Sequence, residues 1–327
     1  MRSMYFIINP KAGNGRCRKV WGKIELQLKD EQIPYLAFFT EYPEHAKQLA
    51  RQIAAKNDHE KIIIAVGGDG TMHEVMNGIF KHKNITLGFI PGGTGNDYSR
   101  GFKIPADPAS ALKVLLRLSK SELVQIDTGK MTMEDGREEY FINNMGAGFD
   151  ALIAYKVNHS RIKAFFNKLS LGRLVYVYLL LRELFTFKTA TIDLSIDGYK
   201  HTFNQTWFVT VSNQPYYGGG MKIAPEAVPN DGFLDITVVH ELSKWKLLLV
   251  FFSVFWGKHI YFSEVKTFKG KQVSIQSKEK LFVHGDGEHI GQSPLKIDIQ
   301  VKAMQVLTRW QNMKEVDVKA RDSNDIH

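Results

Sequence analysis

The stretch KIIIAVGGDGT, residues 61–71, decides how the first part of this chain folds. After its lysine it is apolar and mostly β-branched up to residue 66, which is typical of a buried strand. The three glycines that follow let backbone N–H groups approach an anion, since no Cβ stands in the way. A helical pattern starts at residue 72, so the positive end of that helix points at the same place. The stretch therefore predicts a strand, an anion-binding loop and a helix.

The same alternation extends on both sides of this stretch. Apolar strand-like runs occupy residues 5–8, 35–39, 61–66 and 87–90, and helical spacing occupies residues 18–28, 46–54 and 72–80. Strands that alternate with helices predict a parallel sheet covered on both faces. We assign residues 1–127 to this α/β domain.

The pattern changes after residue 127. The turn dipeptides Asp135-Gly136 and Asp197-Gly198 lie between strand-like stretches, as two-residue hairpins require. Residues 272–301 also read as strands with tight turns, and the aromatic, Leu-rich segments 151–188 and 243–262 interrupt the pattern. We therefore predict an α/β plus β chain with an antiparallel β-sandwich over 128–302 and a flexible tail over 314–327.

Two further glycine-rich loops follow predicted strands: NPKAGNG at 9–15 and PGGTGND at 91–97. Loops at the carboxyl ends of parallel strands meet at one edge of the sheet, where ligands bind. A single such loop is as readily a plain turn, but three of them favour a shared phosphate site. Asp69 would repel a bare phosphate, so it indicates a metal or a ribose contact. The P-loop, the dinucleotide fingerprint and the protein-kinase His-Arg-Asp sequence are all absent.

Composition narrows the class of protein. The chain has 327 residues, 44% hydrophobic and 24% charged, which is ordinary for a globular protein. Its one cysteine, Cys17, excludes internal disulfides and thiolate metal cages. The net charge of +9 suits nucleic acid, an anionic membrane or a phosphorylated ligand, but no nucleic-acid-binding motif occurs. The longest apolar run, residues 247–256, is about half of what a spanning helix needs. We expect a cytoplasmic protein.

Six motifs match a known family. GGDGT at 67–71, PGGTGND at 91–97, NPKAG at 9–13, GGGMKIAP at 218–225, PNDGFLD at 229–235 and HGDGE at 284–288 resemble the diacylglycerol-kinase catalytic family. That family includes bacterial soluble lipid kinases and sphingosine kinases, and its first motif also occurs in NAD kinases. The resemblance covers most of residues 5–305. It implies an NAD-kinase-like α/β domain and a β-sandwich domain with ATP between them, and a return of residues 303–313 to the first domain.

The resemblance also implies roles for individual residues. Glu288 is expected to be the catalytic base. A structural Mg²⁺ is expected on Asp231 and on the backbone carbonyls of Val228 and Phe233. The residues expected to contact ATP come from the glycine loops and a neighbouring strand end: Asn9, Thr40, Gly67, Gly68, Asp69, Gly70, Thr71, Met72, His73, Gly93, Thr94 and Asn96.

The residues themselves suggest some chemistry. Asp69 should act in catalysis through Mg²⁺, because carboxylates beside phosphates need a cation between them. Asp97 could do the same or could cap a helix. Asp286 and Glu288 are two residues apart, which places both on one side of a strand; the competing interpretation is an exposed turn. His284 and His289 show no zinc spacing, and we interpret both as structural.

Two basic, aromatic segments suggest where a lipid binds. Residues 152–190 contain seven Lys/Arg and one acid, and the run 247–256 lies between lysines. Such segments suit an anionic membrane surface, yet either could equally be a buried core helix, or both could be partly true, with one apolar face lining an acyl-chain groove. The partners we expect are a lipid substrate and the inner membrane face, bound weakly and peripherally. We expect no nucleic acid, and the sequence leaves a homodimer open.

The favoured hypothesis is an ATP-dependent lipid kinase that phosphorylates a lipid hydroxyl, of diacylglycerol or a related lipid. One alternative is an NAD-kinase-like enzyme with a polar acceptor. Another is a non-catalytic regulator that binds nucleotide or lipid.

Overall fold

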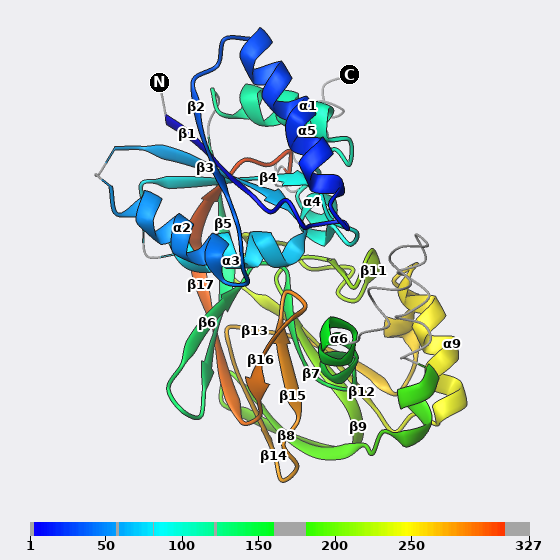
Figure 1. Ribbon diagram of the computed structural model, residues 1–327. Coiled ribbons are helices and arrows are strands. Elements are labelled where there is room, and N and C mark those ends of the chain that lie inside the picture. Colours follow the sequence, from blue (N-terminus) through cyan, green and yellow to red (C-terminus); the bar gives the residue numbers. More distant parts are fainter. Residues whose placement is uncertain (1–2, 57–58, 81, 121–122, 160–180, 311–327) are drawn as a thin grey trace, which may run out of the picture.

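The computed structural model describes residues 3–56, 59–80, 82–120, 123–159 and 181–310. The chain forms two lobes, an α/β lobe that carries the N-terminal elements and a β-rich lobe (Figure 1). The predicted fold class, a parallel α/β sheet followed by an antiparallel sandwich, is confirmed.

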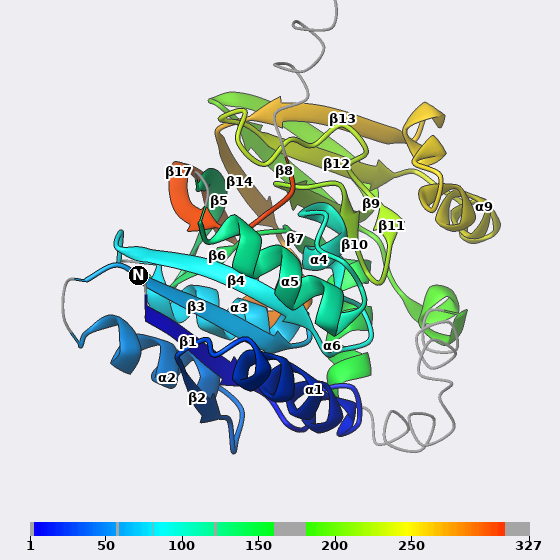
Figure 2. The same cartoon turned by 90° about the horizontal axis from the view of Figure 1, so that it is seen from above.

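The first lobe is built on a parallel sheet in the order β2-β1-β3-β4. Helices α1 and α5 pack together on one face, and α2 and α3 pack together on the other (Figures 1 and 2). The strands and helices are β1 (Ser3–Ile8), α1 (Arg16–Asp30), β2 (Tyr35–Phe39), α2 (His45–Ala54), β3 (Lys61–Gly67), α3 (Asp69–Ile79), β4 (Ile85–Pro91), α4 (Asp97–Gly101) and α5 (Pro108–Leu118).

The covered sheet explains the sequence of β3. Ile62, Ile63 and Ile64 are all completely buried, because one face of the strand packs on each helical layer. On α1, the side chains of Trp21, Ile24 and Leu28 are buried at helical spacing, as predicted. The helix α5 was not predicted, although Asp107 caps it by accepting a hydrogen bond from the Ser110 amide.

The second lobe is an antiparallel sandwich. Its long strand β9 pairs with β8 along its first half and lies between β7 and β12 along its second half. Its elements are β5 (Val124–Met133), β6 (Glu138–Phe141), β7 (Asn144–Gly148), α6 (Phe149–His159), β8 (Ala190–Ile196), β9 (Tyr199–Ser212), β10 (Tyr216–Tyr217), β11 (Met221–Lys222), β12 (Leu234–His240), α9 (Lys244–Val254), η1 (Lys258–Tyr261), β13 (Val265–Gly270), β14 (Gln272–Ser277), β15 (Phe282–Gly285), β16 (Glu288–Gln292) and β17 (Leu295–Val306).

The predicted hairpins are present at both Asp-Gly pairs. Asp197 and Gly198 form the two-residue turn between β8 and β9, and both have positive φ angles. Asp135 and Gly136 lie in the turn between β5 and β6. The Asp-Gly signal therefore located real chain reversals in this lobe.

One strand joins the two lobes. β17 pairs with β14 and β5 in the second lobe, and its end pairs in parallel with β4, with Gln305 opposite Thr86 and Val306 opposite Leu87. β5 contributes Ile126 to the core of the first lobe. We propose the division into 1–127 and 128–302, with 303–313 returning to the first domain; residues 311–313 and the tail 314–327 lie outside the described residues.

Helices α6 and α9 lie beside the sandwich (Figure 1). They enclose a separate apolar cluster that includes Phe149, Leu247 and Val250. Among the described residues, none of the helices combines the length and the apolar character needed to cross a bilayer.

Candidate active site between the two lobes

The glycine loops that follow β3 and β4 touch each other. The amide of Gly92 donates a hydrogen bond of 2.6 Å to the carbonyl of Gly67. A Cβ on Gly93 would lie 2.5 Å from the Cα of Gly68, so a larger residue would push the two loops apart. The glycines here therefore permit a close backbone approach.

The loop after β1 joins them. The side-chain amide of Asn9 donates to Thr71 Oγ1 at 3.0 Å. Gly13 has a φ of 56°, and a Cβ there would lie 2.5 Å from the carbonyl oxygen of Gly92. Thr40 is buried at the end of β2 and donates its amide to the last carbonyl of β1 at 2.9 Å. Three loops and a strand end thus share one edge of the sheet.

Helix α3 starts inside the second of these loops. Gly68 is its N-cap residue, and no side chain caps the helix. The N–H groups of a first helical turn have no partner within the helix and attract anions. Asp69, the first helical residue, accepts a hydrogen bond of 3.1 Å from the Tyr98 amide, which links α3 to α4.

Glu288 reaches this loop from the other lobe. Its Oε1 lies so close to Gly70 that a Cβ on Gly70 would collide with it. Glu288 is the first residue of β16, directly after the turn between β15 and β16. The structure therefore brings Glu288 and the GGDGT loop together across the junction between the lobes.

The expectation that Asp286 and Glu288 share one face of a strand is wrong. Asp286 and Gly287 form the two-residue turn between β15 and β16, with φ angles of 52° and 88°. Because a turn separates them, the two carboxylates point to different places. The turn is not exposed, since Asp286 is buried.

Asp286 holds the second lobe against α3. Its oxygens accept backbone hydrogen bonds from Ile142, Asn143 and Asn144 at 2.8–3.2 Å, and its Oδ2 lies 3.2 Å from His73 Nδ1. Burial alone lowers the pKa of His73, but the hydrogen bond and charge of Asp286, with the charges of Glu139 and Glu288, raise it above its ordinary value. This ion pair fixes the hairpin that carries Glu288.

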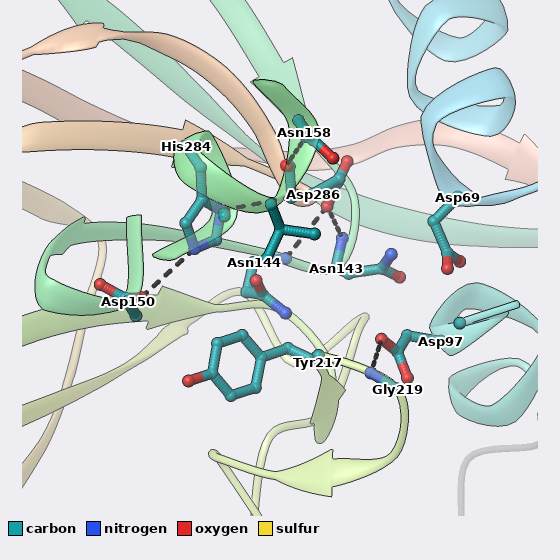
Figure 3. Close-up of a pocket in the computed structure, with 15 residues that line it drawn as sticks. Asp69, Asp97, Asn143, Asn144, Asp150, Asn158, Tyr217, Gly219, His284 and Asp286 are labelled. Carbon is teal, nitrogen blue, oxygen red and sulfur yellow. Dashed lines mark hydrogen bonds and ion pairs between the residues drawn. The ribbon is translucent and has the colours of Figure 1, made fainter. Parts of the chain in front are cut away.

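A cavity of about 250 Å³ lies between the lobes. Asp69 and Asp97 face it from the first lobe, opposite Asp286 and His284 of the second (Figure 3). Burial and, after it, the charge of Asp97 raise the pKa of the Asp69 carboxyl to about 7. The cavity is lined by Asp69, Gly95, Asp97, Asn143, Asn144, Asp150, Ala154, Val157, Asn158, Tyr217, Gly218, Gly219, His284, Asp286 and Gly287.

Asp97 is tied to both lobes. It does not cap α4, since Asn96 occupies the N-cap position. Its Oδ1 accepts from Arg100 at 2.7 Å, and its Oδ2 accepts from the Gly219 amide at 2.7 Å (Figure 3). Burial still raises the pKa of Asp97 above its ordinary value, despite these partners. The half-buried Asp69 and the buried Asp97 therefore adjoin without enough positive charge to balance both.

A second, apolar pocket adjoins the polar cavity, and the two share Asp150 and Tyr217. Asp150 Oδ2 lies 3.2 Å from His284 Nε2, and the Gly287 amide donates to His284 Nδ1, so His284 is expected to donate to Asp150. Asp150 Oδ1 is buried and has no partner among the described residues. The apolar pocket is lined by Phe149, Asp150, Ile153, Phe208, Tyr217, Met221, Ile223, Leu247, Leu248, Val250, Phe251 and Val254.

Three of the residues predicted to contact ATP differ from the others in burial or backbone conformation. The Met72 side chain is buried in the core, so only its backbone faces the loop region. Thr94 is exposed at the tip of its loop. Asn96 has a φ of 55° and donates to the Gly93 carbonyl at 3.2 Å, while its buried Oδ1 has no partner among the described residues.

The predicted metal residues lie elsewhere. The Asp231 carboxylate accepts from the Phe233 amide at 3.0 Å and is ion-paired with Lys269 at 3.0 Å. Lys269 also lies 3.6 Å from Asp235, whose pKa burial raises to about 6. The described part of the chain contains no cluster of three His, Cys, Asp or Glu residues placed to hold a metal. A Mg²⁺ on Asp231, with the carbonyls of Val228 and Phe233, remains a prediction, and Lys269 already supplies the positive charge there.

Several cavity residues were not identified from the sequence as part of a site. Asn143 and Asn144 line the cavity because their backbone amides donate hydrogen bonds to Asp286. Asp150 lines it because α6 packs against β15. Tyr217 belongs to a short strand beside the glycine motif 218–220. The one local signal was that an Asn-Asn pair and an Asp flank the glycine-rich strand 144–148.

Two family descriptions match the chain. Residues 3–131 match "Diacylglycerol kinase catalytic domain", and residues 143–308 match "YegS C-terminal NAD kinase beta sandwich-like domain". Together they span both lobes.

Individual relatives agree with these matches. The chain is 36% identical over 314 residues to the Bacillus subtilis (strain 168) protein named "Putative lipid kinase YtlR", covering 94% of this chain and 100% of the relative. It is 29% identical to a "Diacylglycerol kinase" of Mycobacterium tuberculosis (strain ATCC 25618 / H37Rv), covering 92% and 93%. A crystal structure titled as a putative diacylglycerol kinase from Bacillus anthracis str. Sterne superposes with a TM-score of 0.72 at 26% identity, covering 94% and 97%.

Proposed function

The chain belongs to the diacylglycerol kinase and lipid kinase family, and on that premise we propose that it transfers the γ-phosphoryl group of ATP to a lipid hydroxyl. The acceptor is diacylglycerol or a related lipid. The observation that carries the proposal is the position of Glu288 directly against the GGDGT loop, beside a polar cavity that adjoins an apolar pocket.

The touching glycine loops support a nucleotide site. Backbone N–H groups at the start of α3 suit the phosphates, and Lys11 and Arg16 on the first loop add positive charge. Asn9, Thr40, Thr71 and the glycines of the loops surround the same edge of the sheet. We assign ATP to this edge, with its γ-phosphate toward Asp69.

The pair Asp69 and Asp97 fits a Mg²⁺ ion that accompanies ATP. Asp97 is buried and Asp69 half-buried, the pKa of each is raised, and a hard cation prefers such oxygen ligands. The unpartnered Oδ1 of Asn96 is a further oxygen in the same loop. When bound, the ion neutralises phosphate charge and makes phosphorus easier to attack.

Glu288 accepts the proton of the attacking lipid hydroxyl in this proposal. It must come within about 2.6–3.2 Å of that oxygen in the productive complex. The contacts of Asp286 with His73 and three backbone amides hold the hairpin so that Glu288 faces Gly70. Phosphoryl transfer depends mostly on such positioning and on charge neutralisation.

The two adjoining pockets support a lipid acceptor over a polar one. The polar cavity accommodates a hydroxylated head group, and the unpartnered Asp150 Oδ1 can accept a hydrogen bond from it. The apolar pocket between α6 and α9 accommodates the start of an acyl chain. An NAD-kinase-like enzyme with a polar acceptor would not need such an apolar pocket. A non-catalytic regulator would not need Glu288 beside the loop.

The decisive experiment incubates the purified chain with labelled ATP, Mg²⁺ and a panel of acceptors: diacylglycerol, ceramide, sphingosine, phosphatidylglycerol and NAD. We expect label in a lipid product, with diacylglycerol or a close relative favoured. Label in NAD alone would establish the polar-acceptor alternative. Binding of ATP without turnover of any acceptor would establish the regulator.

A lipid substrate also places the protein at a membrane. We propose that it works in the cytoplasm on the inner membrane face, held there weakly and peripherally. Of the basic segment 152–190, residues 160–180 lie outside the described residues. A homodimer remains a proposal, which light scattering would test.

A further inference from the structure

Helix α9 is apolar on all sides. Eight of its eleven residues are apolar, and those on one face, Leu247, Val250 and Val254, are buried against the apolar cluster of the second lobe. A helix that is apolar all round normally lies in a protein core or in a membrane. The helix therefore needs a second apolar surrounding on its other side.

That other side carries an aromatic stripe, which we define as Trp245, Leu249, Phe252 and Trp256. These residues follow one another at spacings of four, three and four, so they lie on one helix face continued into the turn after it. Their exposed fractions are 69%, 66%, 60% and 69%. Large apolar side chains gathered in this way mark an interaction surface, whereas single exposed ones do not.

The stripe continues onto a neighbouring segment. The ring of Phe185 lies 5.7 Å from that of Trp245, and Phe185 is itself 50% exposed. Lys244 donates to the carbonyl of Phe185 at 2.6 Å, which fixes the segment against α9. The surface thus spans two separate stretches of the chain.

Positive charge surrounds the stripe. Arg182, Lys188 and Lys258 are exposed on the segments that carry it. Of the acids on these segments, Glu183 is paired with Lys156 and lies 3.8 Å from Arg182, Glu264 is paired with Lys246, and Glu241 lies 3.7 Å from His240. Exposed tryptophans bordered by cations are typical of surfaces that enter the interface of an anionic bilayer.

We propose that the stripe on α9 docks on an anionic lipid bilayer and sets the apolar pocket beside the membrane. The inner face of α9 supplies Leu247, Val250 and Phe251 to that pocket. In the docked protein, α9 therefore lies between the bilayer and the pocket. The reason for docking rests on the proposed lipid kinase function, whereas the position of the docking surface rests on the stripe alone.

The chain offers a direct probe in its five tryptophans. Trp21, Trp207 and Trp310 are buried, whereas Trp245 and Trp256 both belong to the stripe. With phosphatidylglycerol–phosphatidylcholine vesicles at low salt, the wild-type emission should shift to shorter wavelength, and bromine-labelled acyl chains should quench it. Phosphatidylcholine alone, or high salt, should weaken both effects.

The double variant Trp245→Ser/Trp256→Ser should bind vesicles at least about tenfold more weakly. Tyr199→Ser is the matched control, because Tyr199 is 76% exposed on the remote β8–β9 hairpin. The double variant should still phosphorylate a water-soluble short-chain acceptor, since neither tryptophan lines a pocket.

Three results would overturn the proposal. The first is a double variant that sediments with vesicles as the wild type does. The second is wild-type emission that vesicles leave unchanged, because another segment or a second copy then covers the stripe. The third is a dimer that the double substitution abolishes while vesicle binding persists. Failure of all lipid phosphorylation with quenching intact would instead count against the proposed function only.

Discussion

Two places in this chain hold neighbouring carboxylates, and they differ in how their charge is balanced. At the turn after β11, Lys269 lies within 3.0 Å of Asp231 and 3.6 Å of Asp235. Between the lobes, Asp97 is paired with Arg100, and burial followed by the charge of Asp97 raises the pKa of Asp69 to about 7. Carboxylates shielded from water without a counter-charge are costly, which supports the proposal that a cation binds at the second place.

In the proposed function, the Asp231 turn has a structural role and the cavity between the lobes a catalytic one. At the Asp231 turn, Lys269 pairs with both carboxylates, although burial still raises the pKa of Asp235 to about 6. In the proposed function, the cavity between the lobes takes up a cation and an acceptor. Predictions that remove single groups from each place test this distinction.

The largest effect is expected at Glu288. Glu288→Gln should lower lipid phosphorylation by about 10²–10⁴-fold, because the amide cannot accept the hydroxyl proton. ATP binding, measured by calorimetry, should stay the same. Glu279→Gln, a change of an exposed glutamate in the same lobe, serves as the control. Full activity in Glu288→Gln would remove Glu288 from the reaction.

A smaller loss is expected at Gly70. Gly70→Ala adds a Cβ where Glu288 Oε1 lies, so the carboxylate must move. The rate should fall by about 10- to 100-fold, as expected for a misplaced catalytic group. Gly22→Ala on α1 meets no atom within 4 Å and should stabilise the fold by up to about 1 kcal/mol without changing the rate. Equal rates in both variants would contradict the contact.

Asp69 should show a pH signature in stability. Its folded pKa of about 7 lies above the unfolded value near 4, so the folded state holds more protons between these values. Stability from this group is therefore greatest below about pH 4 and falls as the pH rises through about 7. Asp69→Asn should be more stable than the wild type at pH 8 by about 1–3 kcal/mol, although its transfer activity should be lost.

Urea unfolding of both proteins from pH 4 to pH 8 measures that difference. The gap between wild type and Asp69→Asn should close toward the acid end, where Asp69 is protonated. A gap that stays constant across the range would show that the Asp69 carboxyl titrates normally.

The smallest effect is expected at Lys269. Lys269→Met leaves Asp231 and Asp235 without their shared cation and should cost about 1 kcal/mol at neutral pH. Mg²⁺ should recover part of this loss, since the freed carboxylates suit a hard cation. Lys266→Met, on the same strand β13, is the control. Equal stability of Lys269→Met and the wild type would mean that the Asp231 turn does not depend on its lysine.

The sequence predicted the fold because its signals are local. Apolar runs of β-branched residues placed β1, β3 and β4, and the Asp-Gly pair at 197–198 placed a hairpin. For the same dipeptide at 286–287, the sequence left open a strand or an exposed turn, and the structure shows a buried turn. The pairing of β17 with β4 joins residues more than 200 positions apart, and only resemblance suggested it.

The site was predictable only in part for the same reason. The glycine loops were recognisable in the sequence as strand-loop-helix units, and the family resemblance predicted the role of Glu288. Asn143, Asn144 and Asp150 acquire their place through the buried Asp286 turn, a tertiary contact with no local pattern. For the run 247–256, the sequence left open a core helix, a membrane surface or part of each, and α9 buries one apolar face and exposes the other.

The central claim is that Gly70 matters because it leaves room for Glu288. A double-mutant cycle of Gly70→Ala and Glu288→Gln, measured by single-turnover transfer from labelled ATP to diacylglycerol, tests it most directly. In the Glu288→Gln background, Gly70→Ala should change the rate by less than about twofold, because no catalytic carboxylate remains to be displaced. If the two losses multiply in full, Gly70 and Glu288 act independently, and the proposed contact between the lobes is not what positions the base.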